Sequence, residues 1–215
     1  MVTLIYWLRS HRRALAGWLL ALFCPLPVIA APAGWPESPR AEFQVESYDM
    51  VSDGVPIRVS ELVGAGLRLR VDPVGGWDLA AERPGEYSIM LAHRSNPGVR
   101  LGFSVFGAQE LVRSLESEDW DLHVSRVHEL CGQALVKLTT SGSPDAGNMF
   151  VLGQPYRELT YTRKDLAGDG MKSRREVFVA LGEKLLVVSL EGEAGAVEGL
   201  GHAFELFIAR LEWVH

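Results

Sequence analysis

The sequence predicts an α+β domain, in which a mainly antiparallel β-sheet is covered by a long central helix and a C-terminal helix. Several short segments alternate apolar and polar residues, which is typical of strands, and two longer segments place apolar residues at helical spacing. Three successive strand segments near the C-terminal end are joined by short connections, which require antiparallel pairing. The 215 residues are enough for one ordinary domain and a targeting segment.

Alternation with a period of two predicts strands that are buried on one face. Segments of this kind are 66–72, 99–106 and 157–164. Two further segments, 87–91 and 175–180, also suggest strands. The segment KLLVVSL, residues 184–190, is almost entirely apolar. We therefore expect it to be a central strand covered on both faces.

Two segments have the helical period. From Trp120 to Leu138 the apolar residues fall on one stripe, which predicts a helix of roughly five turns over about 117–140. A second apolar stripe runs from Val197 to Leu211 and predicts the C-terminal helix. Glycines near its start weaken that helix, so packing must hold it in place.

The first 33 residues have the pattern of an export signal. A cationic start that includes Arg12 and Arg13 is followed by an apolar run over 14–23 and by small residues around Ala30. The apolar run is short for a membrane span of about 20 residues, so we expect cleavage rather than an anchor. Because of the arginine pair, export by the twin-arginine route stays open as an alternative to export by the general secretory route.

These observations divide the chain into three parts. Residues 1–33 are predicted to be a signal peptide, 34–42 a tether rich in proline and polar residues, and 43–215 a single domain. The protein is therefore expected in the periplasm or outside the cell, without a stable membrane span once the signal is removed.

The exported part is acidic. Removing residues 1–33 takes away three of the 21 Lys and Arg residues and none of the 27 Asp and Glu residues, so the formal charge changes from −6 to −9. Nucleic acid is an unfavourable partner for such a chain because its phosphates would be repelled. The exported part keeps one cysteine, Cys131, which excludes an internal disulfide.

The order of elements resembles the PsbP-like fold, a group that includes exported bacterial relatives of the DcrB family. The resemblance rests on GLRLRVDPVGGWDL at 66–79, on the helix predicted over about 117–140, and on the strand, turn, strand and helix ending over 174–213. It implies a binding, assembly or chaperone module rather than an enzyme. A fold alone does not fix a function.

The segment DLAGDGMKSRRE, residues 165–176, has four marks of an EF-hand calcium loop. However, Ala167 stands at the third position, where an oxygen ligand is needed, and both flanks alternate like strands rather than helices. Gly168, Asp169 and Gly170 are residues that a tight reversal favours. The segment is therefore predicted to be a hairpin turn without a metal.

No catalytic, cofactor-binding or metal-binding group emerges from the residue spacing. His123 and His128 are five residues apart, which on a helix does not place two ligands on one metal, and Asp119 is expected to form a surface ion pair with His123. Ser104 lies in a sequence that fails the serine-elbow pattern, and Cys131 lies on an apolar stripe. We therefore expect a protein that is not an enzyme and holds no cofactor.

Trp77 follows two glycines at the end of a predicted strand. It is interpreted as a core aromatic residue, with a contact to a partner as the alternative, because tryptophans often contribute much of an interface's energy.

The function expected from the sequence is that of an exported, non-enzymatic binding, assembly or chaperone-like module that acts on a protein partner through an acidic surface. Two alternatives stay open. One is an enzyme, such as a hydrolase, whose site is assembled only in three dimensions from residues such as His93, His202 and Asp78. The other is a small-ligand carrier with an apolar cavity. The identity of the partner and the oligomeric state are not encoded in any recognisable pattern.

Overall fold

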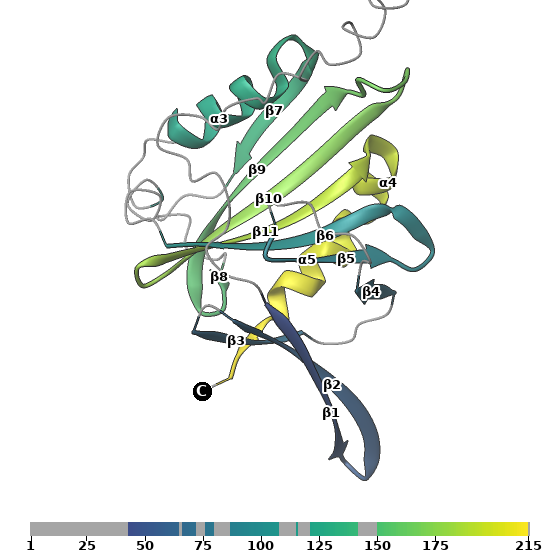
Figure 1. The fold of residues 1–215 in the computed structure, drawn as a ribbon, viewed down its shortest axis with the longest axis vertical. Coiled ribbons are helices and arrows are strands. Elements are labelled where there is room, and N and C mark those ends of the chain that lie inside the picture. Colours follow the sequence, from purple (N-terminus) through teal and green to yellow (C-terminus); the bar gives the residue numbers. More distant parts are fainter. Residues whose placement is uncertain are drawn as a thin grey trace, which may run out of the picture. The chain divides into compact units, whose positions relative to one another are not determined.

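Two antiparallel β-sheets form the framework of the computed structural model (Figure 1). The structure describes residues 43–64, 66–71, 76–79, 87–107, 115, 121–141 and 150–214, which all belong to one unit of the chain, residues 31–215. The predicted signal peptide (1–33) and tether (34–42) lie outside the described residues.

The smaller sheet has the strand order β1-β2-β3-β12. Its strands are β1 (Gln44–Ser52), β2 (Val55–Gly64), β3 (Leu67–Val71) and β12 (Glu212–Trp213). The larger sheet has the order β4-β5-β6-β11-β10-β9-β7, with β8 paired to β9. Its strands are β4 (Trp77–Leu79), β5 (Ile89–His93), β6 (Asn96–Phe106), β7 (Leu135–Ser141), β8 (Phe150–Val151), β9 (Gln154–Lys164), β10 (Met171–Leu181) and β11 (Lys184–Glu193).

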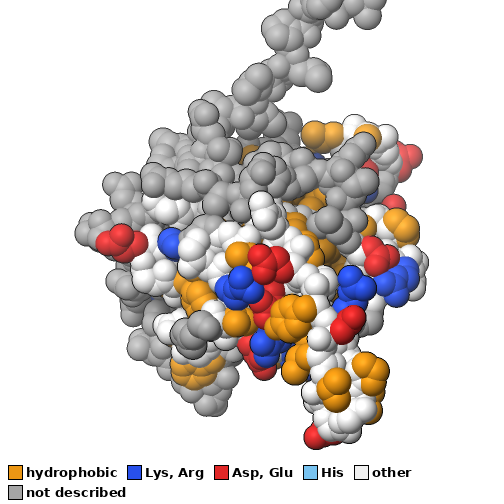
Figure 2. All heavy atoms as spheres, turned by 60° about the horizontal axis from the view of Figure 1, so that its bottom comes forward, with side chains coloured by type: hydrophobic (Ala, Val, Ile, Leu, Met, Phe, Trp, Pro, Cys, Tyr) orange, Lys and Arg blue, Asp and Glu red, His pale blue; other side chains and the backbone are white. Residues whose placement is uncertain are grey.

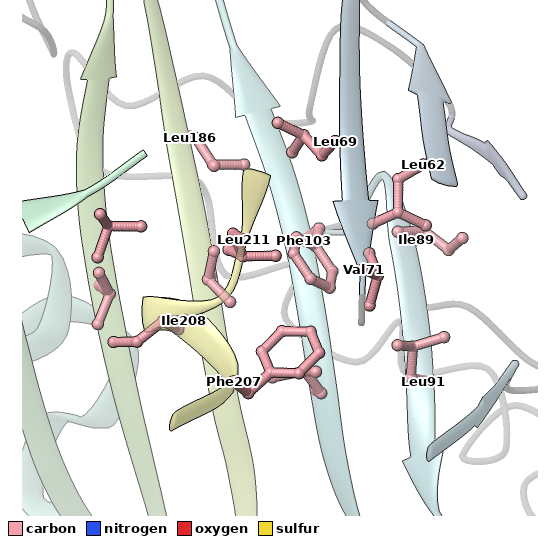
Figure 3. Close-up of a cluster of buried hydrophobic side chains, with 14 of the residues drawn as sticks. Leu62, Leu69, Val71, Ile89, Leu91, Phe103, Leu186, Phe207, Ile208 and Leu211 are labelled. Carbon is pink, nitrogen blue, oxygen red and sulfur yellow. The ribbon is translucent and has the colours of Figure 1, made fainter. Parts of the chain in front are cut away.

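One face of the larger sheet packs against the smaller sheet and the C-terminal helices α4 (Ala194–Gly199) and α5 (Gly201–Ala209). Figure 3 shows Phe207 of α5 next to Phe103 of the larger sheet, and Leu62 of the smaller sheet next to Ile89 of the larger sheet. The Phe103 and Phe207 rings meet edge to face at 6.0 Å. Burial of each large apolar side chain contributes about 1.5–3 kcal/mol, so this cluster is a main source of stability.

The other face of the larger sheet packs against the helix α3 (Asp121–Cys131). Val127 and Cys131 of α3 are buried against Leu159, Tyr161 and Phe178 of the sheet. Strand β11 lies between the two clusters, and its residues from Leu185 to Leu190 are all buried. The prediction of a central strand covered on both faces is therefore confirmed.

The strand predictions are also confirmed in their positions. The alternation over 66–72 and 99–106 corresponds to β3 and β6, and the segments 157–164 and 175–180 lie in β9 and β10. The segment 87–91 overlaps β5. In β3, Leu67, Leu69 and Val71 are buried while the two arginines between them are half-buried, as the alternation indicates.

The prediction of a long central helix is wrong. Within the described part of 117–140, α3 has 11 residues and ends at Cys131, a short 3-10 helix (Gly132–Ala134) follows, and the chain continues as β7. Gly132 has φ +50°, a left-handed conformation that terminates a helix. Beyond it, Val136 and two threonines favour a strand, and β7 pairs with β9.

The C-terminal helix is also shorter than predicted. Two helices of six and nine residues meet at Leu200, whose φ of −96° and ψ of 2° interrupt the helical geometry. The predicted stripe still packs, because Val197, Phe204, Phe207 and Leu211 are buried. The described chain is thus mostly antiparallel sheet with short helices, not a sheet covered by a long central helix. The long helix over about 117–140 was one of the three features on which the resemblance to the PsbP-like fold rested, and that feature is absent from the described residues. No helix in the described part of the chain is long and apolar enough to cross a membrane.

Gly102 provides a test of the packing on the α3 side of the sheet. A Cβ atom at this position would overlap the ring of buried Tyr87 and lie 2.9 Å from Ser189 Oγ. We therefore expect Gly102→Ala to lower the free energy of unfolding in urea by roughly 1–3 kcal/mol, the usual cost of overpacking.

The matched control is Gly168→Ala, because a Cβ atom there would meet nothing within 4 Å. Its free energy of unfolding should stay within about 0.5 kcal/mol of the unmodified protein. Equal effects of the two substitutions would contradict the packing described for Tyr87.

Candidate functional site

The hairpin formed by β1 and β2 extends beyond the rest of the smaller sheet (Figure 1). All nine residues of β1 are exposed, and so are the first four residues of β2. The two strands pair over nine positions, from Gln44 opposite Val63 to Ser52 opposite Val55. The end of the hairpin therefore has little support from the core, and its surface is open to contacts.

The turn between the two strands is Asp53-Gly54, with φ values of 52° and 79°. Positive φ at both central residues is the type I′ geometry, which matches the twist of a two-stranded hairpin and which Asp-Gly adopts readily. The turn therefore fixes the register of the whole hairpin.

Apolar side chains cover much of this hairpin. Six apolar or aromatic residues of the two strands are at least 37 % exposed, namely Val45, Tyr48, Met50, Val51, Val55 and Ile57. Figure 2 shows hydrophobic side chains on the surface of its projecting end. Where the hairpin meets the end of α5 there is a cavity of about 560 Å³, whose lining includes Met50, Ile57 and Val59 together with Arg58, Arg70 and Arg210. Clustered exposed apolar side chains are typical of an interaction surface.

A buried carboxylate anchors the base of the hairpin. The Glu61 side chain is 1 % exposed, accepts a hydrogen bond from the Tyr48 hydroxyl, and lies 2.7 Å from Arg68 Nη1 and 3.5 Å from Arg70 Nη2. The Tyr48 hydrogen bond holds the pKa of Glu61 below its ordinary value against the opposing effect of burial, and Arg68 contributes in the same direction. The hairpin is thus fixed to β3 at its base and unsupported at its end.

Sequence analysis did not identify this surface, because residues 41–65 lie outside the segments that resemble the PsbP-like fold. A signal was nevertheless present. Asp-Gly at 53–54 lies between two runs that contain Val, Ile and Tyr, and Asp-Gly between such runs is a strong local indication of a hairpin.

Trp77 lies in β4 opposite His93 of β5, and the two rings meet edge to face at 5.0 Å. The indole is half-buried and packs against the large apolar cluster. The structure thus places it at the border of the core, and its proposed contact with a partner stays a prediction.

The residues considered for an enzyme site lie on different elements. Asp78 is exposed and forms a two-contact ion pair with Arg94, at 2.7 and 3.1 Å. His202 lies on α5, is 82 % exposed, and is 3.8 Å from Glu205. His93 packs beside Trp77. None of these three residues lines the cavity beside the hairpin.

The segment 165–176 is a hairpin turn, as predicted. Asp165 N–H donates to the Gly170 carbonyl at 2.8 Å, and the Asp165 carboxylate accepts a hydrogen bond from Ala167 N–H at 3.1 Å. Glu176 is buried inside β10, where it pairs with Arg126 of α3. Among the described residues, no group of three or more His, Cys, Asp or Glu side chains is arranged to hold a metal.

His123 is buried, contrary to the expectation of a surface ion pair with Asp119, which lies outside the described residues. Its ring is 0 % exposed and meets Phe178 edge to face at 4.7 Å. Burial, with the neighbouring Arg126 charge, lowers the pKa of His123 to about 4. The other candidates also lie in buried positions, with Ser104 on β6 and Cys131 on α3.

Comparisons with known proteins give weak similarity. No protein-family model matches the chain, and no curated protein matches its sequence. The structure is similar to PA94 of Pseudomonas aeruginosa, a protein of unknown function, with 9% identity, 77% of this chain and 95% of that chain covered, and a TM-score of 0.37. It is also similar to LpqN of Mycobacterium tuberculosis, a protein involved in cell envelope biogenesis. The identity is 8%, the match covers 80% of this chain and 92% of that chain, and the TM-score is 0.41. Similarity at this level leaves the PsbP-like relationship a proposal.

The buried imidazole makes folding sensitive to acid. Because the pKa of His123 is about 4 in the folded chain and near 6.5 when unfolded, the unfolded state binds more protons below pH 6.5. The contribution of the neutral His123 side chain to the free energy of unfolding is therefore fully present above pH 6.5, and it is lost as the pH is lowered toward 4. We expect urea denaturation to show a loss of about 2 kcal/mol between pH 7 and pH 5.

The variant His123→Gln should remove most of this pH dependence, whatever its effect on stability at pH 7. The matched control is His202→Gln, which replaces an exposed imidazole and should leave the loss unchanged. A pH profile that is the same in all three proteins would show that His123 is not the responsible group.

Proposed function

We propose that this chain is an exported, non-enzymatic binding module that contacts a protein partner through the β1–β2 hairpin. The observation that carries the proposal is the group of exposed apolar side chains on a hairpin that, among the described strands, pairs with β3 only near its base. Export is supported by the signal-like pattern of residues 1–33.

Energetics favour a contact at this surface. An isolated two-stranded hairpin is marginally stable in water. Covering Met50, Val55 and Ile57, which lie on one face of the hairpin, would remove their apolar surface from water, and each side chain that is fully buried contributes about 1.5–3 kcal/mol. A partner that packs on the hairpin gains this free energy and also supports its unsupported end.

The backbone of β1 offers the second part of the contact. Among the described residues β1 pairs only with β2, so one of its edges is free. In a hairpin with a two-residue turn, Ser52 and Val55 form a hydrogen-bonded pair, and the pair types alternate from there. The outward-facing N–H and C=O groups therefore belong to Val45, Ser47, Asp49 and Val51. An extended segment can pair with them as an additional strand.

Charge specifies the chemistry of that segment. The strand β1 contains Glu46 and Asp49 and no basic residue, and Asp53 follows in the turn. Asp49 and Asp53 form no ion pair with the described residues, and Glu46 pairs with Arg68 at 3.1 Å. Basic side chains beside the apolar positions of the partner would complement these acids. We therefore propose an extended, apolar and basic segment of an exported protein as the ligand.

Crosslinking in the producing cell tests the proposal. A photoreactive residue at Val51, which is 69 % exposed, should give a discrete crosslinked product with a second protein. The same residue at Leu166 in the β9–β10 turn, which is 82 % exposed, is the matched control and should give none.

The crosslink must also depend on strand addition. Ser47→Pro removes an outward-facing N–H group and the hydroxyl contact with Ser60 while leaving the backbone hydrogen bonds between β1 and β2 intact, so the yield at position 51 should fall about tenfold. Ser47→Ala removes the same hydroxyl but keeps the N–H group and should retain the yield. A product that persists in Ser47→Pro, or the absence of any product at position 51, would contradict this mode of binding.

A further inference from the structure

A second surface feature lies on the larger sheet, apart from the hairpin. A cavity of about 400 Å³ opens over the ends of the four neighbouring strands β6, β11, β10 and β9. Its charged lining residues are Arg100, Arg163, Lys172, Arg174 and Glu191. We call this cavity the cationic groove. Four basic residues and one acidic residue thus line a groove on a chain whose formal net charge is −6.

Two of the four cations form no ion pair within the described ranges of the chain. Arg100 and Arg163 form no ion pair with any described residue, and Arg100 is exposed while Arg163 is half-buried. Lys172 has a long contact of 3.5 Å with Asp165, and both side chains are partly exposed. Within the part of the chain that the structure describes, the lining of the groove thus contains more positive than negative charge.

Arg174 is held in place at the floor of the groove. Its Nε atom lies 2.9 Å from Glu176 Oε1, its Nη1 atom lies 3.4 Å from Glu191 Oε2, and its guanidinium stacks over the Tyr87 ring at 5.2 Å. Glu191 in turn accepts a hydrogen bond of 2.7 Å from the Tyr87 hydroxyl. The carboxylate of the lining is thus engaged by Arg174 and Tyr87, and it forms no ion pair with Arg100 or Arg163.

The strand register explains why these residues meet. Glu191 lies opposite both Arg100 of β6 and Arg174 of β10, and Arg174 lies opposite Tyr161 of β9. Residues directly opposite each other point to the same face of a sheet. Arg163 is two residues beyond Tyr161 and therefore lies on that face too. Three strand spacings of about 4.8 Å separate the backbones of β6 and β9, so the groove is about 14 Å wide at its base.

We propose that the cationic groove binds a small oxyanion with at least two negatively charged groups. Guanidinium groups recognise phosphate and carboxylate through paired hydrogen bonds, and two arginines from different strands can each hold one such group. The volume of about 400 Å³ is within the range of small-molecule sites, about 300–1,000 Å³. The ligand class is therefore a multivalent phosphate or carboxylate compound.

Isothermal titration calorimetry of the purified protein with sodium pyrophosphate and with citrate tests this proposal. At least one of the two should bind with a measurable heat. Arg163→Gln and Arg100→Gln should each weaken that binding about tenfold, because each removes charged hydrogen bonds to the anion. Tighter binding of pyrophosphate would identify phosphate groups as the preferred chemistry, and tighter binding of citrate would identify carboxylates.

Arg94→Gln is the matched control. It removes the same charge from an exposed arginine that pairs with Asp78 outside the groove, and the affinity should stay unchanged. The hairpin variant Ser47→Pro should also bind the anion normally, so this test and the crosslinking test can fail independently. The proposal is overturned if neither anion binds, if Arg94→Gln weakens binding as much as Arg163→Gln, or if inorganic phosphate or acetate binds as tightly as the multivalent probes.

Discussion

The buried carboxylate of Glu176 is the interaction on which the α3-covered face of the larger sheet depends. It is 1 % exposed in β10, next to the apolar residues that α3 covers, and a charge in such a place requires compensation. Arg126 of α3 and Arg174 of β10 supply it, and they hold the pKa of Glu176 below its ordinary value although burial opposes the charge. The position of the short helix is thus fixed by charge as well as by apolar contact. Breaking one side of such a buried pair typically costs about 3–5 kcal/mol.

The same carboxylate organises the surface next to it. Arg174 is oriented by Glu176 on one side and by Glu191 on the other, and the Tyr87 ring lies beneath its guanidinium. Gly102 leaves the space that this ring occupies. Core and groove are therefore one continuous arrangement, in which the residues that satisfy a buried charge also present a fixed cation to solvent. A preorganised cation loses little conformational freedom when it binds an anion.

Period-two alternation located the strands because their faces differ in burial. The helical prediction over 117–140 failed for a physical reason. Apolar residues at 134 and 138 fit a helical stripe, yet Gly132 ends the helix and the register with β9 decides the structure that follows. Burial of His123 was not predictable, since it depends on Phe178, which is distant in sequence. The groove was likewise hidden, because Arg100 and Arg163 are 63 positions apart and only the pairing of β6, β11, β10 and β9 brings them to one face.

The two surfaces differ in how they are supported, and this difference suits different ligands. The end of the β1–β2 hairpin has no core beneath it, so its local stability is low and its strands can adjust to a long partner segment. The groove rests on the ends of strands whose middles are buried on both faces, so the backbone positions that carry its cations are fixed. A small anion gains affinity from fixed charges, whereas a strand gains it from many backbone bonds formed in succession. The adaptable edge of the hairpin and the basic groove therefore suit the two different ligands that are proposed for them.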